Sequence, residues 1–199
     1  MESIMTKVTR FAPSPTGSLH IGGVRTALFN FVYSKQQKGK FLIRIEDTDA
    51  ERSTREFEGN ILKGLADMGI VPDETPVRQS ERSELYQNAI TQIIDSGKAY
   101  YCDCSKERLD EMRSTQQANG LKPQYDGKCR NLNLSKSEKS VLRLKTPQEG
   151  ELIFHDLVRG EVIFQNSELD DLILVRSDGT PTYHFCNVID DHDQGVTTV

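Results

Sequence analysis

The sequence lacks any apolar run that approaches the roughly 18 residues needed for a membrane-spanning helix. Its first ten residues, MESIMTKVTR, contain neither the apolar core and small-residue cleavage site of a secretory signal nor the Arg- and Ser-rich composition of a transit peptide. Hydrophobic residues make up 36% of the chain and charged residues 28%, which is typical of a globular protein. On these absences we expect a soluble, cytoplasmic protein that has no membrane partner.

The sequence also has no excess of basic over acidic residues. The chain has 25 Lys and Arg residues against 30 Asp and Glu residues, a formal net charge of −5 at pH 7. This balance excludes a protein that holds nucleic acid through a globally basic surface. A local basic patch on the surface is compatible with this net charge.

Cysteine is scarce, with four residues in the chain. Cys102, Cys104 and Cys129 lie in one segment, which in an intracellular protein indicates a metal cluster rather than disulfide bonds. Cys186 stands apart, and we expect it to be an ordinary buried thiol.

The first part of the chain predicts alternating strands and helices. Residues 8–12 favour a strand, residues 24–38 carry apolar side chains at helical spacing up to Gly39, and residues 41–46 favour a second buried strand. A strand, a helix and a strand in this order make a βαβ unit with a parallel sheet.

Two further helices precede a segment of different character. The sequence from Ser53 to Glu56 has the form of a capping box, and helical spacing follows it to Gly69 and recurs over residues 85–97. We interpret the chain beyond residue 100 as an insertion, which begins with a polar helix over residues 106–118 that ends at Asn119-Gly120. Short β-prone runs then predict a small antiparallel unit at residues 141–145, 151–156, 161–166 and 172–176.

The stretch RFAPSPTGSLHIGG, residues 10–23, lies between the first strand and the first helix. In an open parallel sheet, ligands bind at the carboxyl ends of the strands, where a helix N-terminus offers amide donors and a positive dipole to anions. Gly17, Gly22 and Gly23 allow a ligand to approach the backbone, and His20 can hydrogen-bond a phosphate. Composition alone fits a structural turn with an exposed histidine equally well.

Several motifs, in order, resemble the class I aminoacyl-tRNA synthetases, whose signature begins His-Ile-Gly and stands here as HIGG, residues 20–23. Within that class the chain is similar to the bacterial glutamyl-tRNA synthetases through RFAPSPTG, HIGGVRTALFN, RIEDTD, DGTPTYHF and an intervening CxC and YDGKC region. The resemblance covers essentially all 199 residues. Gly23 departs from the general signature, which has histidine there in many members.

The resemblance implies a two-step reaction. Glutamate attacks the α-phosphate of ATP to give glutamyl-adenylate and pyrophosphate, and the acyl group then passes to the 3′-terminal adenosine of tRNA(Glu). No enzyme nucleophile is implied, because positioning and charge stabilisation, aided by Mg²⁺, carry such chemistry. The positions assigned to catalysis and ATP binding are Thr16, Gly17, His20, Gly22 and Gly23.

The resemblance assigns glutamate recognition to Arg10, Ala12, Ser14, Glu46, Tyr183 and Asn187. The residue types suit this task, since Arg10 can form a fork with a carboxylate, Ser14 can donate a hydrogen bond and Glu46 can pair with the substrate ammonium. Tyr183 and Asn187 are four residues apart and share one face of a helix. Without the resemblance, Glu46 reads as a solvated loop carboxylate and Tyr183 as a half-buried core ring.

A structural zinc site is a further implication. Three thiolates and a fourth ligand form a closed tetrahedral site, and the Tyr-x-x-x-Cys spacing after Cys-x-Cys resembles the related glutamyl-queuosine tRNA synthetases. Other relatives have a histidine as fourth ligand at the position of Asn131. We therefore expect Zn²⁺ at Cys102, Cys104, Tyr125 and Cys129, or else three reduced thiols in an insertion that has lost its metal.

Two groups of charged residues have simpler interpretations. The run Asp190-Asp191-His192-Asp193 lies near a predicted helix end, and we expect these side chains to face solvent rather than to bind a metal. Lys122, Lys128 and Arg130 are candidate phosphate contacts for the acceptor end of tRNA.

The predicted fold is a doubly wound, Rossmann-like α/β domain interrupted by an inserted α+β acceptor-binding domain. Residues 1–99 are expected to form the first half of the catalytic domain, 100–178 the insertion and 179–199 the start of the second half. We expect a monomer. Since no lysine-rich KMSKS-like loop or anticodon-binding domain is present, we also expect an N-terminal fragment that is inactive or impaired in isolation.

Two alternatives stay open. A glutamyl-queuosine tRNA(Asp) synthetase has the same activation chemistry, although HIGGVRTALFNF favours the glutamyl enzyme, and a glutaminyl enzyme is disfavoured further. A non-catalytic, zinc-bearing RNA-interaction module would keep the fold as a scaffold. The presence together of Arg10, His20 and Glu46 argues against that module.

Overall fold

The computed structural model describes residues 6–49 and 52–199. The chain forms two compact units, one made of Met1–Gln87 with Cys186–Val199 and the other of Asn88–Phe185. Within the described ranges, no helix combines the length and the apolar character needed to cross a lipid bilayer.

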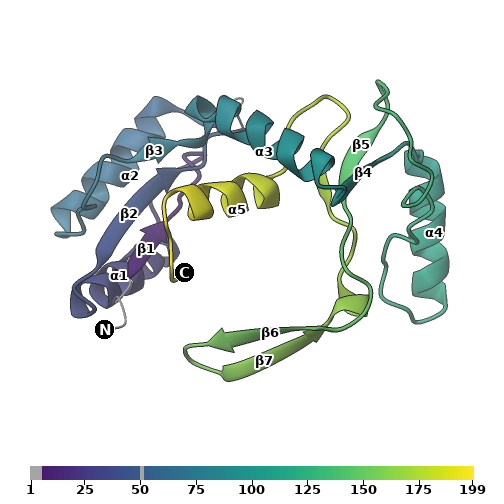
Figure 1. Cartoon of the computed structure of the whole chain (residues 1–199). Helices are drawn as coiled ribbons and strands as arrows, with labels where there is room; N and C mark the ends of the chain where they lie inside the picture. The colour runs from purple at the N-terminus through teal and green to yellow at the C-terminus, as the bar shows by residue number, and fades with distance from the viewer. Residues whose placement is uncertain (1–5, 50–51) are drawn as a thin grey trace. The chain divides into compact units, whose positions relative to one another are not determined.

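A parallel three-stranded sheet runs through the first unit (Figure 1). Its strands are β1 (Val8–Phe11), β2 (Lys40–Ile45) and β3 (Val77–Arg78), in the order β1-β2-β3. The helix α1 (Ile21–Gln36) connects β1 to β2, and α2 (Arg55–Asp67) connects β2 to β3, which runs into the short helix η1 (Gln79–Glu81). The predicted βαβ unit is thus confirmed.

The outer edge of β1 is also paired in parallel. Thr198 forms a parallel bridge to Thr9, and the N–H groups of Thr197 and Thr198 both donate to the carbonyl oxygen of Val8, at 2.9 and 3.1 Å. The C-terminal residues therefore extend the parallel sheet on the side of β1 opposite to β2.

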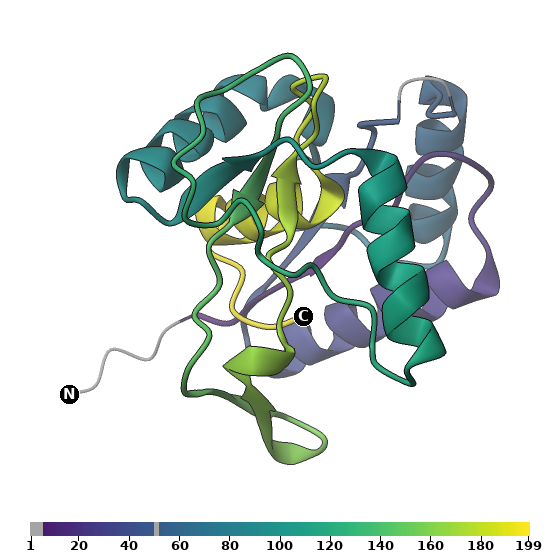
Figure 2. The same ribbon diagram turned by 90° about the vertical axis from the view of Figure 1, so that its right-hand side faces the viewer.

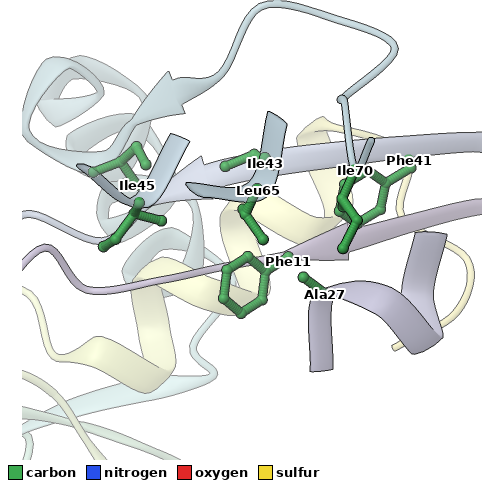
Figure 3. Close-up of a cluster of buried hydrophobic side chains, with 8 residues drawn as sticks. Phe11, Ala27, Phe41, Ile43, Ile45, Leu65 and Ile70 are labelled. Carbon is green, nitrogen blue, oxygen red and sulfur yellow. The ribbon is translucent and has the colours of Figure 1, made fainter. Parts of the chain in front are cut away.

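The two faces of the sheet differ in polarity because successive residues of a strand point to opposite sides. Phe41, Ile43 and Ile45 of β2 share one face. They form a buried apolar core with side chains of β1, α1, α2 and the segment after α2, namely Phe11, Ala27, Ile61, Leu65 and Ile70 (Figure 3). Complete burial of one such large side chain contributes about 1.5–3 kcal/mol, so this face holds α1 and α2 on the sheet.

Most helices end at the glycines that the sequence predicted. Gly69 after α2, Gly97 after α3 (Ser83–Asp95) and Gly120 after α4 (Lys106–Ala118) all have positive φ angles. After α2 the N–H of Ile70 donates to the carbonyl of Leu65 at 2.9 Å, the hydrogen bond of a Schellman motif. A residue without a Cβ is favoured at such positions.

The end of α1 differs from the prediction that Gly39 closes it. Lys38 has the left-handed conformation, with φ 52°, and the N–H of Gly39 donates to the carbonyl of Ser34 at 2.8 Å. Gly39 is required for another reason, since a Cβ there would lie 2.0 Å from the carbonyl oxygen of Lys7. The glycine allows the helix end to approach the backbone that leads into β1.

The start of α2 lies one residue beyond the predicted capping box. Thr54 is the N-cap, and its Oγ1 accepts a hydrogen bond from the N–H of Phe57 at 3.1 Å. The Oγ of Ser53 has no hydrogen-bond partner among the described residues. Glu56 lies in the first turn, where its charge complements the helix dipole.

The second unit contains an antiparallel sheet in the order β4-β5-β8 and a separate hairpin, β6-β7. The elements are β4 (Ala99–Cys102), β5 (Val141–Leu144), β6 (Glu151–Asp156), β7 (Gly160–Gln165), the short helix η2 (Asn166–Glu168) and β8 (Ile173–Val175). Figures 1 and 2 show the hairpin standing apart from the sheet, joined to it by extended segments. The predicted antiparallel strands are confirmed, but they divide between two sheets.

One strand of this unit was not predicted, and one helix is divided between the two units. β4, with the sequence AYYC, pairs with β5 along its whole length, yet its four residues are too few to show an alternating pattern. The helix α5 (Tyr183–Asp193) begins in the second unit and continues into the first, as its residues from Cys186 onward belong there.

Candidate functional site

The loop of residues 12–20 leaves β1 and is tied to two neighbouring segments. The carbonyl of Pro13 accepts a hydrogen bond from the N–H of Glu46 at 2.9 Å, and the carbonyl of Pro15 accepts one from Thr54 at 3.1 Å. Pro15 is completely buried. The end of β2 and the start of α2 therefore fix the course of this loop.

His20 is the N-cap residue of α1, but its side chain makes no capping hydrogen bond. The residue is exposed, and its ring lies over Gly22, where an added Cβ would be 3.0 Å from His20 Cε1. Gly23 has a packing role, since a Cβ there would be 3.3 Å from Leu19 Cδ1. Gly22 thus makes room for the imidazole, whereas Gly23 allows the helix to pack closely.

The N-terminus of α1 has the electrostatic character of an anion site. Its first turn contains no acidic residue, so no carboxylate offsets the positive end of the helix dipole. Thr16 is exposed in the preceding loop, and a Cβ on Gly17 would meet no atom within 4 Å. The backbone there is accessible to a ligand.

The face of the sheet opposite the apolar core is polar, and it carries Arg10 of β1 and Arg44 of β2. Arg10 donates from Nε and Nη2 to the two carboxylate oxygens of Asp191, both at 3.0 Å. Arg44 donates from Nη1 to Oδ1 of the same aspartate at 2.5 Å. One carboxylate of α5 therefore joins the two arginines.

Arg44 also reaches two of the predicted glutamate-recognition residues. Its Nη2 donates to Oδ1 of Asn187 at 3.0 Å and lies 3.4 Å from Oε1 of Glu46. The Arg44 side chain is 0% exposed, and its Nε lies 3.5 Å from Oδ2 of Asp190. The structure thus brings Arg10, Glu46 and Asn187 together through Arg44 and Asp191. The sequence did not single out Arg44, and it placed Asp191 in a run expected to face solvent.

A second layer of polar groups surrounds Asp190, which is completely buried. Its carboxylate accepts hydrogen bonds from Gln79 Nε2 at 2.8 Å, from Arg82 Nε at 2.7 Å and from the Tyr86 hydroxyl at 2.9 and 3.0 Å. A buried carboxylate is stable only when such donors compensate its desolvation.

These contacts correct the interpretation of the acidic run at the end of α5 as a solvent-facing cluster. Asp190 is buried, Asp191 binds two arginines, and Asp193 pairs with Arg82. The prediction failed because it used the position of the run in the sequence, whereas the partner arginines lie on distant elements. The sequence did contain one indication of this network, because Arg44 is a charged residue within the otherwise apolar strand FLIRI, residues 41–45.

The pKa values of the two carboxyls nearest Arg44 shift in opposite directions. Burial raises the pKa of Glu46, and the Arg44 and Arg10 guanidinium groups oppose that shift. Burial alone would also raise the pKa of Asp191. Hydrogen bonds from Arg10 and Arg44 outweigh this effect and hold the pKa of that carboxyl below its ordinary value. Asp191 is therefore a firmly ionised partner for the arginines, whereas burial disfavours the ionised form of Glu46.

The remaining predicted recognition residues lie outside this network. Ala12 and Ser14 belong to the loop after β1. Tyr183 begins α5 in the second unit, one helical turn before Asn187, and its side chain is 50% exposed beside the ring of His184. Their assignment stays a prediction.

The second unit gathers the three predicted thiol ligands. The sulfur atoms of Cys102, Cys104 and Cys129 all lie within 4.8 Å of one another. The Tyr125 hydroxyl oxygen accepts a hydrogen bond from the Cys102 thiol at 3.3 Å and one from the backbone N–H of Cys129 at 2.9 Å, and it lies 3.6 Å from Cys104 Sγ. The four predicted side chains thus converge on one point.

The donor set fits a zinc ion. Zinc–sulfur bonds of about 2.3 Å in a tetrahedron place the sulfur atoms roughly 3.8 Å apart, and the Sγ atoms of Cys104 and Cys129 lie 3.6 Å apart. The Arg143 guanidinium stacks on the Tyr125 ring, 3.9 Å from its centroid, and fixes the orientation of the phenol. Cys186, by contrast, is a solitary buried thiol, as predicted.

The three basic residues proposed as phosphate contacts have unlike environments. Arg130 is not available for such contact, because it donates to both oxygens of Asp171 at 2.7 and 2.8 Å and to the carbonyl of Thr146 at 2.7 Å. Lys122 Nζ lies 3.5 Å from the carbonyl oxygen of Glu168, and Lys128 is exposed. Arg130 joins two loops of the second unit instead.

Known proteins are similar to this chain both in sequence and in fold. A family model described as "tRNA synthetases class I (E and Q), catalytic domain" matches residues 7–199. The glutamate–tRNA ligase 1 of Caldanaerobacter subterraneus subsp. tengcongensis is 50% identical over 197 residues, which are 96% of this chain and 41% of that protein. The glutamate–tRNA ligase of Francisella tularensis subsp. novicida is 52% identical over 193 residues, with the same coverage. The chain spans about two fifths of the length of these relatives.

Solved structures give the same result. A glutamate tRNA ligase of Elizabethkingia meningosepticum, in complex with its amino acid, superimposes with a TM-score of 0.82 at 38% identity, over 96% of this chain and 42% of that chain. A glutamate-tRNA synthetase of Elizabethkingia anophelis gives a TM-score of 0.83 at 38% identity, over 96% of this chain and 43% of that one. The chain therefore belongs to the class I tRNA synthetases of the E and Q group, and residues 7–199 are catalytic-domain sequence.

Proposed function

We propose that the protein containing this chain attaches L-glutamate to tRNA(Glu) in two steps, formation of glutamyl-adenylate from ATP followed by transfer to the 3′-terminal adenosine. The observation that carries the proposal is the convergence of Arg10, Glu46 and Asn187 on the polar face of the parallel sheet. The relatives named glutamate–tRNA ligase support it over a glutamyl-queuosine enzyme or a non-catalytic RNA-binding module.

The amino acid site would use the charges of this network. A guanidinium matches a carboxylate through paired N–H donors, which suits Arg10 for a carboxylate of glutamate. Glu46, at the carboxyl end of β2, would pair with the substrate ammonium. That cation would also offset the cost of keeping the buried Glu46 ionised, which is reflected in its raised pKa. Ala12, Ser14, Asn187 and Tyr183 would complete the contacts.

ATP with Mg²⁺ would bind at the junction of the loop and α1. The His20 imidazole and the amides of the first turn supply donors for phosphates, and the backbone at Thr16 and Gly17 is accessible to a ligand. Gly22 would serve ATP binding by making room for the His20 imidazole. Bound Mg²⁺ would neutralise phosphate charge during adenylate formation. His20 and the helix N-terminus would orient the phosphates, and no side chain needs to act as a nucleophile.

We further propose that the acceptor-binding insertion predicted for about residues 100–178 lies within the second unit, which runs from Asn88 to Phe185. Zn²⁺ at Cys102, Cys104, Tyr125 and Cys129 would be structural, since four protein side chains leave no open coordination position. Lys122 and Lys128 stay candidates for phosphate contact.

The test is ATP–pyrophosphate exchange with L-glutamate, L-glutamine and tRNA offered in turn. The assay protein is a chimera in which this chain replaces the matched region of the Caldanaerobacter ligase, and the unaltered ligase is the control. We expect exchange that depends on L-glutamate and is lost in the His20→Ala variant. A folded chimera that exchanges with L-glutamine as readily as with L-glutamate, or that is indifferent to His20→Ala, would contradict the proposal.

A further inference from the structure

Arg44 is an unusual residue for the centre of a buried strand. Its neighbours Ile43 and Ile45 are part of the apolar core, whereas its own side chain is 0% exposed on the opposite face. An unpaired buried guanidinium would be prohibitively unstable. Arg44 is retained here only because Glu46, Asn187, Asp190 and Asp191 surround it.

Arg44 determines which end of the Asn187 amide is presented outward. A guanidinium has only donors, so the group of Asn187 that faces it must be the carbonyl oxygen. Gln79 Nε2 lies on the same oxygen at 3.4 Å and reinforces this orientation. The amide nitrogen of Asn187 is consequently turned away from Arg44, as a donor with a fixed direction.

Asp191 fixes the orientation of a second recognition residue, Arg10. It receives Nε and Nη2 of Arg10 on its two oxygens in a bidentate pair, a geometry that sets both the position and the plane of the guanidinium. Since Arg44 holds Asp191 through a third hydrogen bond, the aspartate cannot turn independently. The direction of the Arg10 donors therefore depends on Arg44 as well.

We propose that Asp191 and Arg44 are positioning residues for amino-acid recognition, Asp191 by orienting the Arg10 guanidinium and Arg44 by orienting Asp191, Asn187 and Glu46. This inference rests on the proposed function, because it concerns the same glutamate site. Neither residue needs to touch the substrate. Precise orientation matters because a misplaced guanidinium loses the paired geometry that distinguishes a carboxylate from other acceptors.

The experiment is isothermal titration of L-glutamate into the chimera described above and into two matched variants of it, with substitutions in the same helix. Asp191→Asn keeps the size of the side chain but weakens the bidentate pair, and Asp193→Asn removes an ionised partner of Arg82 outside the Arg10 contact. We expect Asp191→Asn to weaken L-glutamate affinity by about tenfold or more and Asp193→Asn by less than about threefold. The melting temperature of each variant is measured in parallel, since a purely structural role would lower it without changing the affinity of the folded protein.

The outcomes separate the two proposals. A folded chimera without these substitutions that does not bind L-glutamate would overturn the proposed function and this inference with it. Wild-type binding with unchanged affinity in Asp191→Asn would overturn the inference alone. If Asp191→Asn does not fold, Asp191→Glu carries the test, because it keeps the charge but displaces the carboxylate by one methylene. We expect Asp191→Glu to weaken binding too, and wild-type affinity in that variant would overturn the inference.

Discussion

At the scale of single residues, some buried side chains stabilise the fold, whereas others reduce its stability. Ile43 and Phe41 are buried in an apolar core, as their sequence pattern predicts. Glu46, a few residues away, is a buried carboxyl, and burial raises its pKa despite the neighbouring Arg44 and Arg10. A carboxyl with a raised pKa beside two arginines is what the proposed ligand-binding role of Glu46 predicts.

Replacement of Glu46 by Gln tests this explanation. A carboxyl whose pKa is raised by folding reduces stability above its unfolded pKa, because its ionised form is disfavoured in the folded state. We therefore expect Glu46→Gln to unfold at the same or a higher urea concentration at pH 7 while losing L-glutamate binding. A loss of more than about 1 kcal/mol of stability would show that the Arg44 pair is mainly structural.

The residues at the end of α1 give a second prediction at this scale. Lys38 has a φ of 52°, a conformation that costs a residue with a Cβ roughly 1 kcal/mol, whereas a Cβ at Gly39 would clash with the carbonyl of Lys7. We expect Lys38→Gly to raise the free energy of unfolding by about 1 kcal/mol and Gly39→Ala to lower it by more than that. Urea denaturation of both variants measures this, and the opposite order of stability would refute the account of this helix end.

At the scale of elements, the helices were predicted well because their apolar spacing and glycine stops are local signals. Residues 106–118 and the stops at Gly69, Gly97 and Gly120 match the structure. What could not be predicted depends on distant partners. Arg44 and Asp191 pair across 147 residues of sequence, and no local pattern shows that α5 supplies the counter-charges of β1 and β2. The three-thiol cluster was predictable because metal ligands of one residue type are visible as such in a sequence.

The start of α2 is a test of local structure. Thr54 Oγ1 accepts the hydrogen bond from Phe57, whereas the neighbouring Ser53 hydroxyl has no partner among the described residues. Thr54→Ala should cost about 1 kcal/mol of stability, and the matched control Ser53→Ala should cost almost nothing. Chemical denaturation measures both costs. If Ser53 were the N-cap residue, as in the predicted capping box, Ser53→Ala would be the costly substitution and Thr54→Ala would cost almost nothing.

At the scale of the whole molecule, the two compact units have different sources of stability. The first has a continuous apolar core and a buried ionic network, while the second has a small antiparallel sheet and a thiol cluster. Small units with limited cores often depend on a bound metal. The second unit is thus expected to depend on zinc more strongly than the first.

Metal analysis tests that expectation. Protein purified without chelators should contain close to one equivalent of zinc, and Cys129→Ser should reduce both the zinc content and the melting temperature. Cys186→Ser, a buried thiol outside the cluster, is the matched control and should leave the zinc content unchanged. Zinc below about a tenth of an equivalent in the wild-type chain would refute the metal site.

The central claim is that the polar face of β1 and β2, completed by α5, forms a glutamate site, and the most direct measurement is an NMR titration of the isotope-labelled chain with L-glutamate. The account predicts saturable shifts in the side-chain signals of Arg10, Arg44 and Asn187, with much weaker responses to L-glutamine and D-glutamate. No saturable change up to roughly 20 mM L-glutamate, or equal responses to L-glutamine, would contradict it.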